Sequence, residues 1–258
     1  MRSLAPRLLV AAMAMVVVLS CGDVPTFPDG IAFISPIELP SIAVAAGDQL
    51  RDSLGNPAPL RVRAFDQNGQ VVAGVSPTFL ISPVDNGIRI DANGVLTASD
   101  SIRPVHLVAR IGDRLQTTDT VIYVVPRPDQ IVGAATTDSL VGAPAKGTLQ
   151  VTVSGTRGST RSPTRGIVVR YQIVAVNGSP TIDSLRVFLV DDANDPLRNS
   201  ATTAIDTTDA TGVATRYVTV SDTTGIRSVE IRATARPLRA EVIAGNPVSF
   251  RLPLKKGK

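Results

Sequence analysis

The fold of this chain is decided by residues 60–98, which read LRVRAFDQNGQVVAGVSPTFLISPVDNGIRIDANGVLTA. Apolar residues alternate with arginine over Leu60–Ala64, which is the two-residue period of a strand that buries one face. The turn Asp66–Gly69 follows and leads into Val71-Val72, because Asn and Gly readily adopt the backbone conformations that hairpin turns require. The stretch therefore predicts a strand, a hairpin turn and a returning strand.

The same pattern extends over residues 31–126. A second turn of the same kind stands at Asp91–Gly94, and Pro126-Arg127-Pro128 ends the pattern. About seven short strands are predicted, the count expected of an immunoglobulin-like β-sandwich. Besides the two already named, they cover residues 78–82, 88–90, 95–98, 105–111 and 117–125.

Residues 127–258 repeat this logic with different spacing, and Asn177-Gly178 predicts a turn. Leu185, Val187 and Leu189 are expected to share one buried face. No helical periodicity is found after Cys21, so the fold class is all-β with two sandwiches in tandem. The other predicted strands lie in residues 149–153, 167–175, 213–220, 229–234 and 248–252.

Two stretches carry a resemblance to known families. Residues 60–98 resemble the bacterial immunoglobulin-like group 2 pattern, with Phe79 where that pattern usually has Trp. Residues 207–235, TTDATGVATRYVTVSDTTGIRSVEIRATA, are similar to the group 1 pattern of invasin and intimin type. The resemblance implies two scaffold domains, 31–126 and 127–258, of the kind found as spacers in adhesins and envelope proteins. It implies no catalytic residue.

The N-terminus has the layout of an export signal over residues 1–20: Arg2 and Arg7 precede an apolar run, Leu8–Leu19, which is too short to span a bilayer. The tetrad Val18–Cys21 resembles the lipobox of bacterial lipoproteins. That resemblance implies cleavage between Ser20 and Cys21 and lipidation of the Cys21 thiol. A chance cysteine inside an ordinary signal peptide is the alternative.

Residues 21–30 contain two prolines and two aspartates and are predicted to be a lipidated tether. By the lipoprotein resemblance, Gly22 after the cysteine favours delivery to the outer membrane over retention at the inner membrane. Removal of Arg2 and Arg7 leaves 24 basic and 22 acidic side chains (26 − 2 against 22), and this balance argues against a nucleic-acid partner. With one cysteine, the mature chain cannot form an internal disulfide.

His106 is the only histidine and therefore the only candidate for an imidazole base. A nucleophilic hydrolase needs an imidazole as its base, but strand alternation within Val105–Ala109 places His106 on the solvent face. No G-x-S-x-G motif accompanies it. We therefore expect a surface histidine.

Carboxylates could also form a functional site, either as a catalytic pair of the glycosidase type or as ligands of a calcium ion. All the candidates lie in predicted turns, where Asp commonly bonds the local backbone, and no complete calcium-loop spacing is present. A structural role is therefore expected, and calcium binding by the second domain stays open. The candidates are Asp191, Asp192, Asp195, Asp206 and Asp209.

Ligand-binding surfaces are weakly indicated. Tyr171 and Tyr217 lie within predicted strands and are expected to pack rather than to form a sugar-stacking platform. Residues 155–166 carry Arg157, Arg161 and Arg165 and are expected to form a mobile, solvated loop. The lysines Lys255, Lys256 and Lys258 are expected to lie in a frayed tail.

The sequence as a whole predicts a non-enzymatic envelope lipoprotein with no cofactor and no metal site. Its sandwiches would present loops or strand edges to an envelope or surface protein, as in cell adhesion. A passive spacer in an envelope assembly is the main rival. A carboxylate-based hydrolase and a carbohydrate-binding protein are the remaining alternatives.

Overall fold

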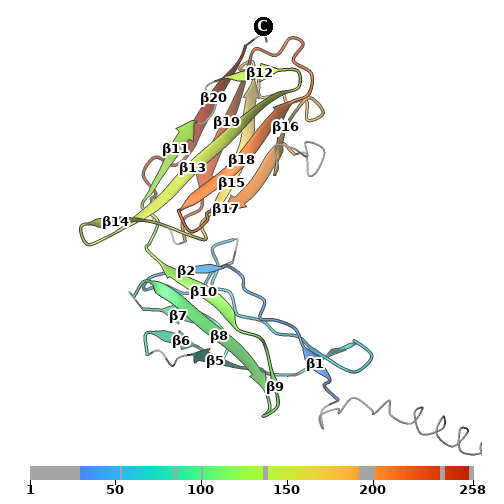
Figure 1. The fold of residues 1–258 in the computed structure, drawn as a ribbon, viewed down its shortest axis with the longest axis vertical. Coiled ribbons are helices and arrows are strands. Elements are labelled where there is room, and N and C mark those ends of the chain that lie inside the picture. The colour runs from blue at the N-terminus through green and yellow to red at the C-terminus, as the bar shows by residue number, and fades with distance from the viewer. Residues whose placement is uncertain are drawn as a thin grey trace, which may run out of the picture. The chain divides into compact units, whose positions relative to one another are not determined.

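The computed structural model describes residues 30–52, 54–82, 84, 86–99, 101–135, 139–191, 201–238 and 242–255 (Figure 1). These residues form strands, turns and irregular segments and include no helix, so the all-β prediction is confirmed. Within them, no helix is long and apolar enough to cross a membrane. The predicted signal peptide, Ser20, Cys21 and the tether up to residue 29 lie outside the described residues.

The strands before residue 126 form three small sheets. In the first, β3 lies between β1 and β4; in the second, the strand order is β2-β10-β8-β5, with β9 paired to β8; β6 and β7 form the third. The β2–β10 pair is parallel. The strands are β1 Phe33–Ile34, β2 Ala43–Ala45, β3 Ala64–Phe65, β4 Val71–Val72, β5 Thr78–Ser82, β6 Ile88–Ile90, β7 Leu96–Ala98, β8 Arg103–Ile111, β9 Leu115–Gln116 and β10 Thr120–Val125.

All seven strands predicted in this half are found, although the one expected over Leu60–Ala64 is reduced to β3. The sequence patterns missed β1, β2 and β9. These strands have two or three residues each, too few to display an alternation.

The two predicted D-x-N-G turns share one hydrogen-bonding arrangement. Asp66 Oδ1 accepts hydrogen bonds of 2.8 Å from the backbone of Asn68 and Gln70, and Asp91 Oδ1 accepts the equivalent pair from Asn93 and Val95. The glycine ending each turn has a positive φ, 75° and 81°. The carboxylate therefore closes the turn, and glycine supplies the left-handed conformation.

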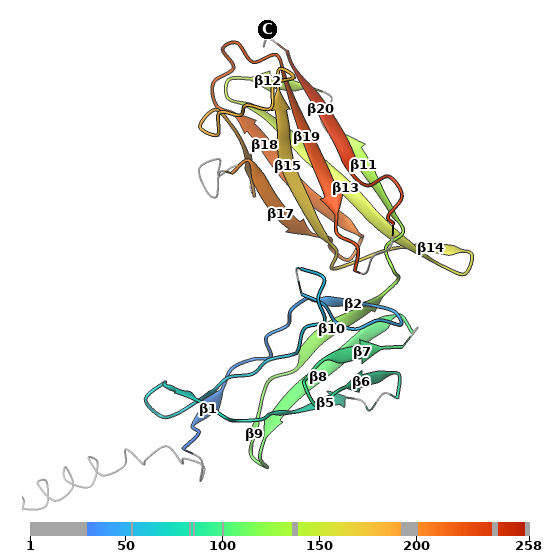
Figure 2. The same ribbon diagram turned by 180° about the vertical axis from the view of Figure 1, so that it is seen from behind.

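The strands after residue 129 form a β-sandwich, residues 130–255, which we call the C-terminal sandwich (Figure 2). One side is formed by β16, β18 and β13, with β11 and β14 also paired to β13; the other has the order β20-β19-β15-β17, and β12 pairs with both β13 and β20. The strands are β11 Gln130–Ala135, β12 Leu140–Gly142, β13 Ala145–Arg157, β14 Thr160–Pro163, β15 Val168–Val176, β16 Val187–Val190, β17 Thr203–Thr207, β18 Val213–Val220, β19 Ser228–Ala235 and β20 Val248–Lys255.

The core of the C-terminal sandwich follows from strand alternation. Every second residue of β13, β15 and β19 is buried, so both sides contribute rows of branched aliphatic side chains to one apolar interior. Burial of the apolar surface of these side chains stabilises the C-terminal sandwich, since no disulfide is available. The fully buried large side chains include Leu149, Ile167, Tyr171, Ile173, Leu189 and Ile231.

Four strands of the C-terminal sandwich were not predicted. β11, β12 and β17 lie in stretches rich in Gly, Ala and Thr, where apolar and polar residues do not alternate clearly. β14 falls inside residues 155–166, which were expected to be a mobile loop. That expectation is wrong: β13 and β14 form a hairpin that turns at Gly158 and Ser159 (Figures 1 and 2).

Packing divides the chain into two compact units. Among the described residues, the first unit gathers those up to Glu38 with Val62–Thr78 and Ala109–Thr118, and its small core contains Ile31, Ala64 and Ile111. The second unit holds the other described residues. In the described part of the chain, no strand before residue 126 pairs with a strand after it.

Candidate functional site

Two loops at one end of the C-terminal sandwich form the candidate site. Residues 177–186 connect β15 to β16, and residues 221–227 connect β18 to β19. The first loop begins at the predicted Asn177-Gly178 turn, where both residues have a positive φ and Val176 and Ser179 exchange backbone hydrogen bonds of 2.9 Å. The turn prediction is confirmed.

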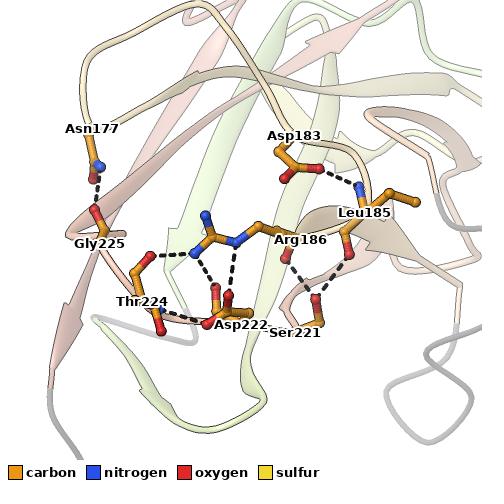
Figure 3. Close-up of polar contacts among 8 residues, drawn as sticks. All are labelled: Asn177, Asp183, Leu185, Arg186, Ser221, Asp222, Thr224 and Gly225. Atoms are coloured by element: carbon orange, nitrogen blue, oxygen red, sulfur yellow. Dashed lines mark hydrogen bonds and ion pairs between the residues drawn. The ribbon is translucent and has the colours of Figure 1, made fainter.

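Asn177 joins the two loops through its side-chain amide. Its Nδ2 donates to the Gly225 carbonyl at 2.7 Å (Figure 3). Its Oδ1 accepts from the backbone of Arg227 at 2.6 Å and of Ser228 at 3.2 Å. One side chain thus satisfies three backbone groups, two in the 221–227 loop and one at the start of β19, which restrains both loops.

Arg186 makes the second link. Its guanidinium donates to the carbonyl oxygens of Asp222, at 3.2 Å, and of Thr224 (Figure 3). Its Nε lies 3.3 Å from Asp222 Oδ2, so the pair is also ionic. Hydrogen bonds from the backbone and hydroxyl of Thr224, with the nearby Arg186 charge, hold the pKa of Asp222 below its ordinary value.

Leu185 presents an exposed apolar side chain at this end of the C-terminal sandwich, with 84% of its surface exposed. The expectation that it shares the buried face of Val187 and Leu189 is wrong. Asp183 accepts hydrogen bonds from the backbone of Leu185, Arg186 and Val187, so a turn extends to Arg186 and the strand, buried throughout, begins only at Val187. Ser221 Oγ donates to the Leu185 carbonyl at 3.0 Å. The leucine is therefore held at the surface.

The sequence analysis did not identify Arg186 or Asp222 as site residues. A signal was present, because Asp222–Gly225 repeats the D-x-x-G spacing of the recognised turns. The pairing of that turn with Arg186 joins residues 36 positions apart and depends on the fold.

The candidate carboxylates within the described residues are engaged in structural bonds. Asp209 Oδ1 accepts hydrogen bonds from Thr211 and Val213, which lower its pKa and close the T-D-A-T-G turn. Asp206 accepts from the backbone of Thr207 and Thr215. Asp191 forms an ion pair with Arg216. Asp192 and Asp195 lie outside the described residues. No group of three or more potential metal ligands occurs among the residues described.

His106 lies on the solvent face of β8, as predicted: Val105 and Leu107 are buried, and 44% of the imidazole side chain is exposed. Its Nδ1 lies 2.5 Å from Asp119 Oδ2. An exposed His–Asp pair alone is not a nucleophilic site, which also needs a hydroxyl or thiol within reach of the imidazole.

The tyrosines and the described basic residues named in the sequence analysis lie in strands or close to strand ends. Tyr171 is fully buried, as expected, and Tyr217 is half-buried on β18. Arg161 lies on β14, where it bonds Gln130 and approaches Asp129. Arg157 ends β13, and Arg165 follows β14. Lys255 ends β20, whereas Lys256 and Lys258 lie outside the described residues.

Comparison with known proteins adds little. No protein-family model matches the sequence, and no curated protein matches it. Among solved structures, domains 4 and 5 of the S-layer protein SbsC are 14% identical at a TM-score of 0.29, covering 88% of this chain and 97% of that one.

Escherichia coli alpha-2-macroglobulin is also 14% identical at a TM-score of 0.29, and the alignment covers 90% of this chain but only 14% of that protein. Beta-glucuronidase 3 of Bacteroides uniformis is 12% identical at a TM-score of 0.27, covering 83% of this chain and 23% of that one. Likenesses at this level carry no functional argument.

Proposed function

We propose that this protein is a non-enzymatic envelope lipoprotein, anchored by lipid on Cys21, whose two immunoglobulin-like domains present a preorganised loop end to a protein partner. The lipobox-like tetrad Val18–Cys21 supports the anchor, and Gly22 after it favours the outer membrane. The role in adhesion or in protein–protein contact rests on the loop end of the C-terminal sandwich.

The observation that carries this proposal is the exposed Leu185 on a restrained surface. Asn177 and Arg186 tie the two loops together, so little conformational entropy remains to be lost when a partner binds. An exposed apolar side chain with a polar rim is the composition of a small protein-contact centre.

The experiment is a pull-down from the native envelope with the full mature chain and two matched variants. Leu185→Ser removes the exposed leucine, and Val242→Ser removes a side chain that is 89% exposed in the β19–β20 connection. We expect the first variant to lose a partner that the second retains. Identical partner sets for both variants and the natural chain would contradict a role for this loop end.

A passive spacer is the second candidate, and one observation favours it. The polar groups that hold the loop end bond one another: Arg186 bonds the 221–227 loop, and Asn177 bonds Gly225, Arg227 and Ser228. A spacer would show no partner loss for either variant while remaining anchored.

The anchor itself is tested by metabolic labelling with a fatty-acid probe in the native host. We expect the natural chain to be labelled and to fractionate with membranes, and Cys21→Ser to lose both properties. An unlabelled natural chain that is freely released from the envelope would refute the lipoprotein assignment.

A further inference from the structure

The three-stranded sheet β1-β3-β4 has two faces of different character. Ile34, Ala64 and Val72 lie opposite one another across the strands and pack with the core around Ile31. The adjacent residues of the same strands form a second row, in which Phe65 pairs with both Phe33 and Val71. Since successive side chains alternate between faces, this second row lies on the opposite side of the sheet. We call it the outer row.

The outer row is apolar and accessible. Phe33 is 48% exposed and Val71 is 60% exposed, and Phe65 between them is partly exposed. The rings of Phe33 and Phe65 stack with centroids 5.0 Å apart and an interplanar angle of 13°. Exposed apolar groups gathered in this way mark an interaction surface more often than isolated ones do.

One arginine beside the outer row is paired. Arg63 precedes Phe65 by two residues, so it lies on the same face, and its Nε is 3.0 Å from Glu38 Oε1. An arginine that is neutralised in this way contributes little attraction for anionic surfaces. Any docking of this row should therefore depend on apolar contact more than on charge.

The position of the outer row in the chain indicates its occupant. Phe33 follows Cys21 by twelve residues (33 − 21), a separation that spans at most about 40 Å when fully extended. Lipid on Cys21 would thus hold the row close to a bilayer and raise its effective concentration there.

A second copy of the chain is a poorer occupant. A stable dimer interface buries about 800 Å² on each partner, and three side chains on strands of two residues fall well short of that area. A weak contact between the outer row and the bilayer needs no such area, because the lipid anchor already holds the chain at the membrane.

We propose that the outer row, Phe33, Phe65 and Val71, is a membrane-contact face that enters the interfacial layer of the bilayer to which the chain is anchored. Aromatic and aliphatic side chains presented on one face favour that layer. The inference rests on the proposed lipid anchor, and it adds that the first compact unit lies against the membrane.

The test uses two properties of the mature chain: Cys21 is its only cysteine, and it has no tryptophan. Coupling the Cys21 thiol to a maleimide lipid in phosphatidylcholine vesicles supplies an anchor whether or not the native host acylates it. Phe33→Trp and Val71→Trp then place a single fluorophore in the outer row. Val242→Trp is the control, at an exposed apolar position in the C-terminal sandwich.

We expect coupling to shift the emission of Phe33→Trp and Val71→Trp to shorter wavelength and to make it quenchable by brominated lipid, with Val242→Trp unchanged. The same result is expected when phosphatidylglycerol is included. Urea unfolding midpoints matching that of the natural chain would establish that both variants fold; a variant that fails this check is replaced by Phe65→Trp.

Three results would overturn the proposal. They are unchanged emission on coupling, equal quenching of Val242→Trp, and quenching that requires phosphatidylglycerol. A blue-shifted emission already present before coupling would also count against it, indicating residues 22–29 as the occupant if it persists on dilution and a second copy if it fades. Failure of the fatty-acid labelling described above would instead refute the native anchor.

Discussion

The hydroxyl of Tyr171 donates a 2.8 Å hydrogen bond to the backbone carbonyl of Ala214, and both residues are fully buried. Tyr171 belongs to β15 and Ala214 to β18, which lie on opposite sides of the C-terminal sandwich. This bond therefore connects the two sides through the core, where the other contacts are mostly between aliphatic side chains.

Tyr171→Phe should lower the free energy of unfolding by about 1 kcal/mol, because it removes one buried hydrogen bond and leaves the ring volume unchanged. Urea unfolding followed by circular dichroism measures the change. Tyr217→Phe, at a half-buried position on β18, is the matched control and should cost less. Equal effects would show that the hydrogen bond to Ala214 contributes nothing.

Stability should fall at alkaline pH through the same residue. Burial, and after it the Asp206 carboxylate, raise the pKa of Tyr171 well above its ordinary value of 10.0. Above about pH 10 the unfolded chain releases this proton while the folded chain retains it, so unfolding becomes more favourable as pH rises.

The natural chain should then lose about 1.4 kcal/mol per pH unit relative to Tyr171→Phe above about pH 10. Unfolding curves for the two proteins between about pH 9 and 11 measure this difference. Parallel pH profiles would exclude a raised pKa at Tyr171.

Gly212→Ala should destabilise the C-terminal sandwich by about 3 kcal/mol. Gly212 has a φ of 74°, and an added Cβ would lie 2.5 Å from the carbonyl oxygen of Val153. Gly158 has a φ of 61° with open space around it, so Gly158→Ala should cost only the conformational strain, about 1 kcal/mol. Thermal unfolding of both variants compares them; similar losses would mean that the backbone gives way at Val153.

Arg216→Met should cost about 3 kcal/mol. The arginine is 8% exposed, and its guanidinium pairs with Asp191 and donates to the Ile205 carbonyl on β17. Removing it leaves those partners without their cation. Arg251→Met removes an 80% exposed arginine that pairs with Glu230 and should cost under about 1 kcal/mol. Urea unfolding separates the two cases, and a cost at Arg216 no larger than at Arg251 would contradict the assignment.

Asn177→Ala should loosen the loop end of the C-terminal sandwich. The amides of Arg227 and Ser228 lose their acceptor, so their hydrogen exchange should accelerate about fivefold to tenfold. The Ala235 amide, which bonds Asn246 Oδ1 at 3.0 Å, is an internal control and should exchange at its former rate. Unaltered exchange at Arg227 would remove the evidence that Asn177 restrains the loops.

The limits of prediction are visible at Leu185 and Arg216. Leu185 continues an apparent alternation in the sequence, but the turn set by Asp183 ends that alternation before the strand begins. Arg216 is polar yet lies on the buried side of β18, between Ala214 and Val218, because Asp191, just after β16, and Ile205 of β17 supply its partners. The first outcome depends on a local side-chain bond that overrides the alternation, and the second depends on residues distant in the chain.

The sequence by itself determined the all-β class, the D-x-N-G turns, the longer alternating strands and the solvent-facing position of His106. These depend on local backbone preference and on the two-residue period of a strand. Tertiary structure alone decided the link between Asn177 and the 221–227 loop, the bond from Tyr171 to Ala214, and the pairing of Phe33 with Phe65. Each joins residues far apart in the chain, and no local pattern specifies which distant strand or loop will become the neighbour.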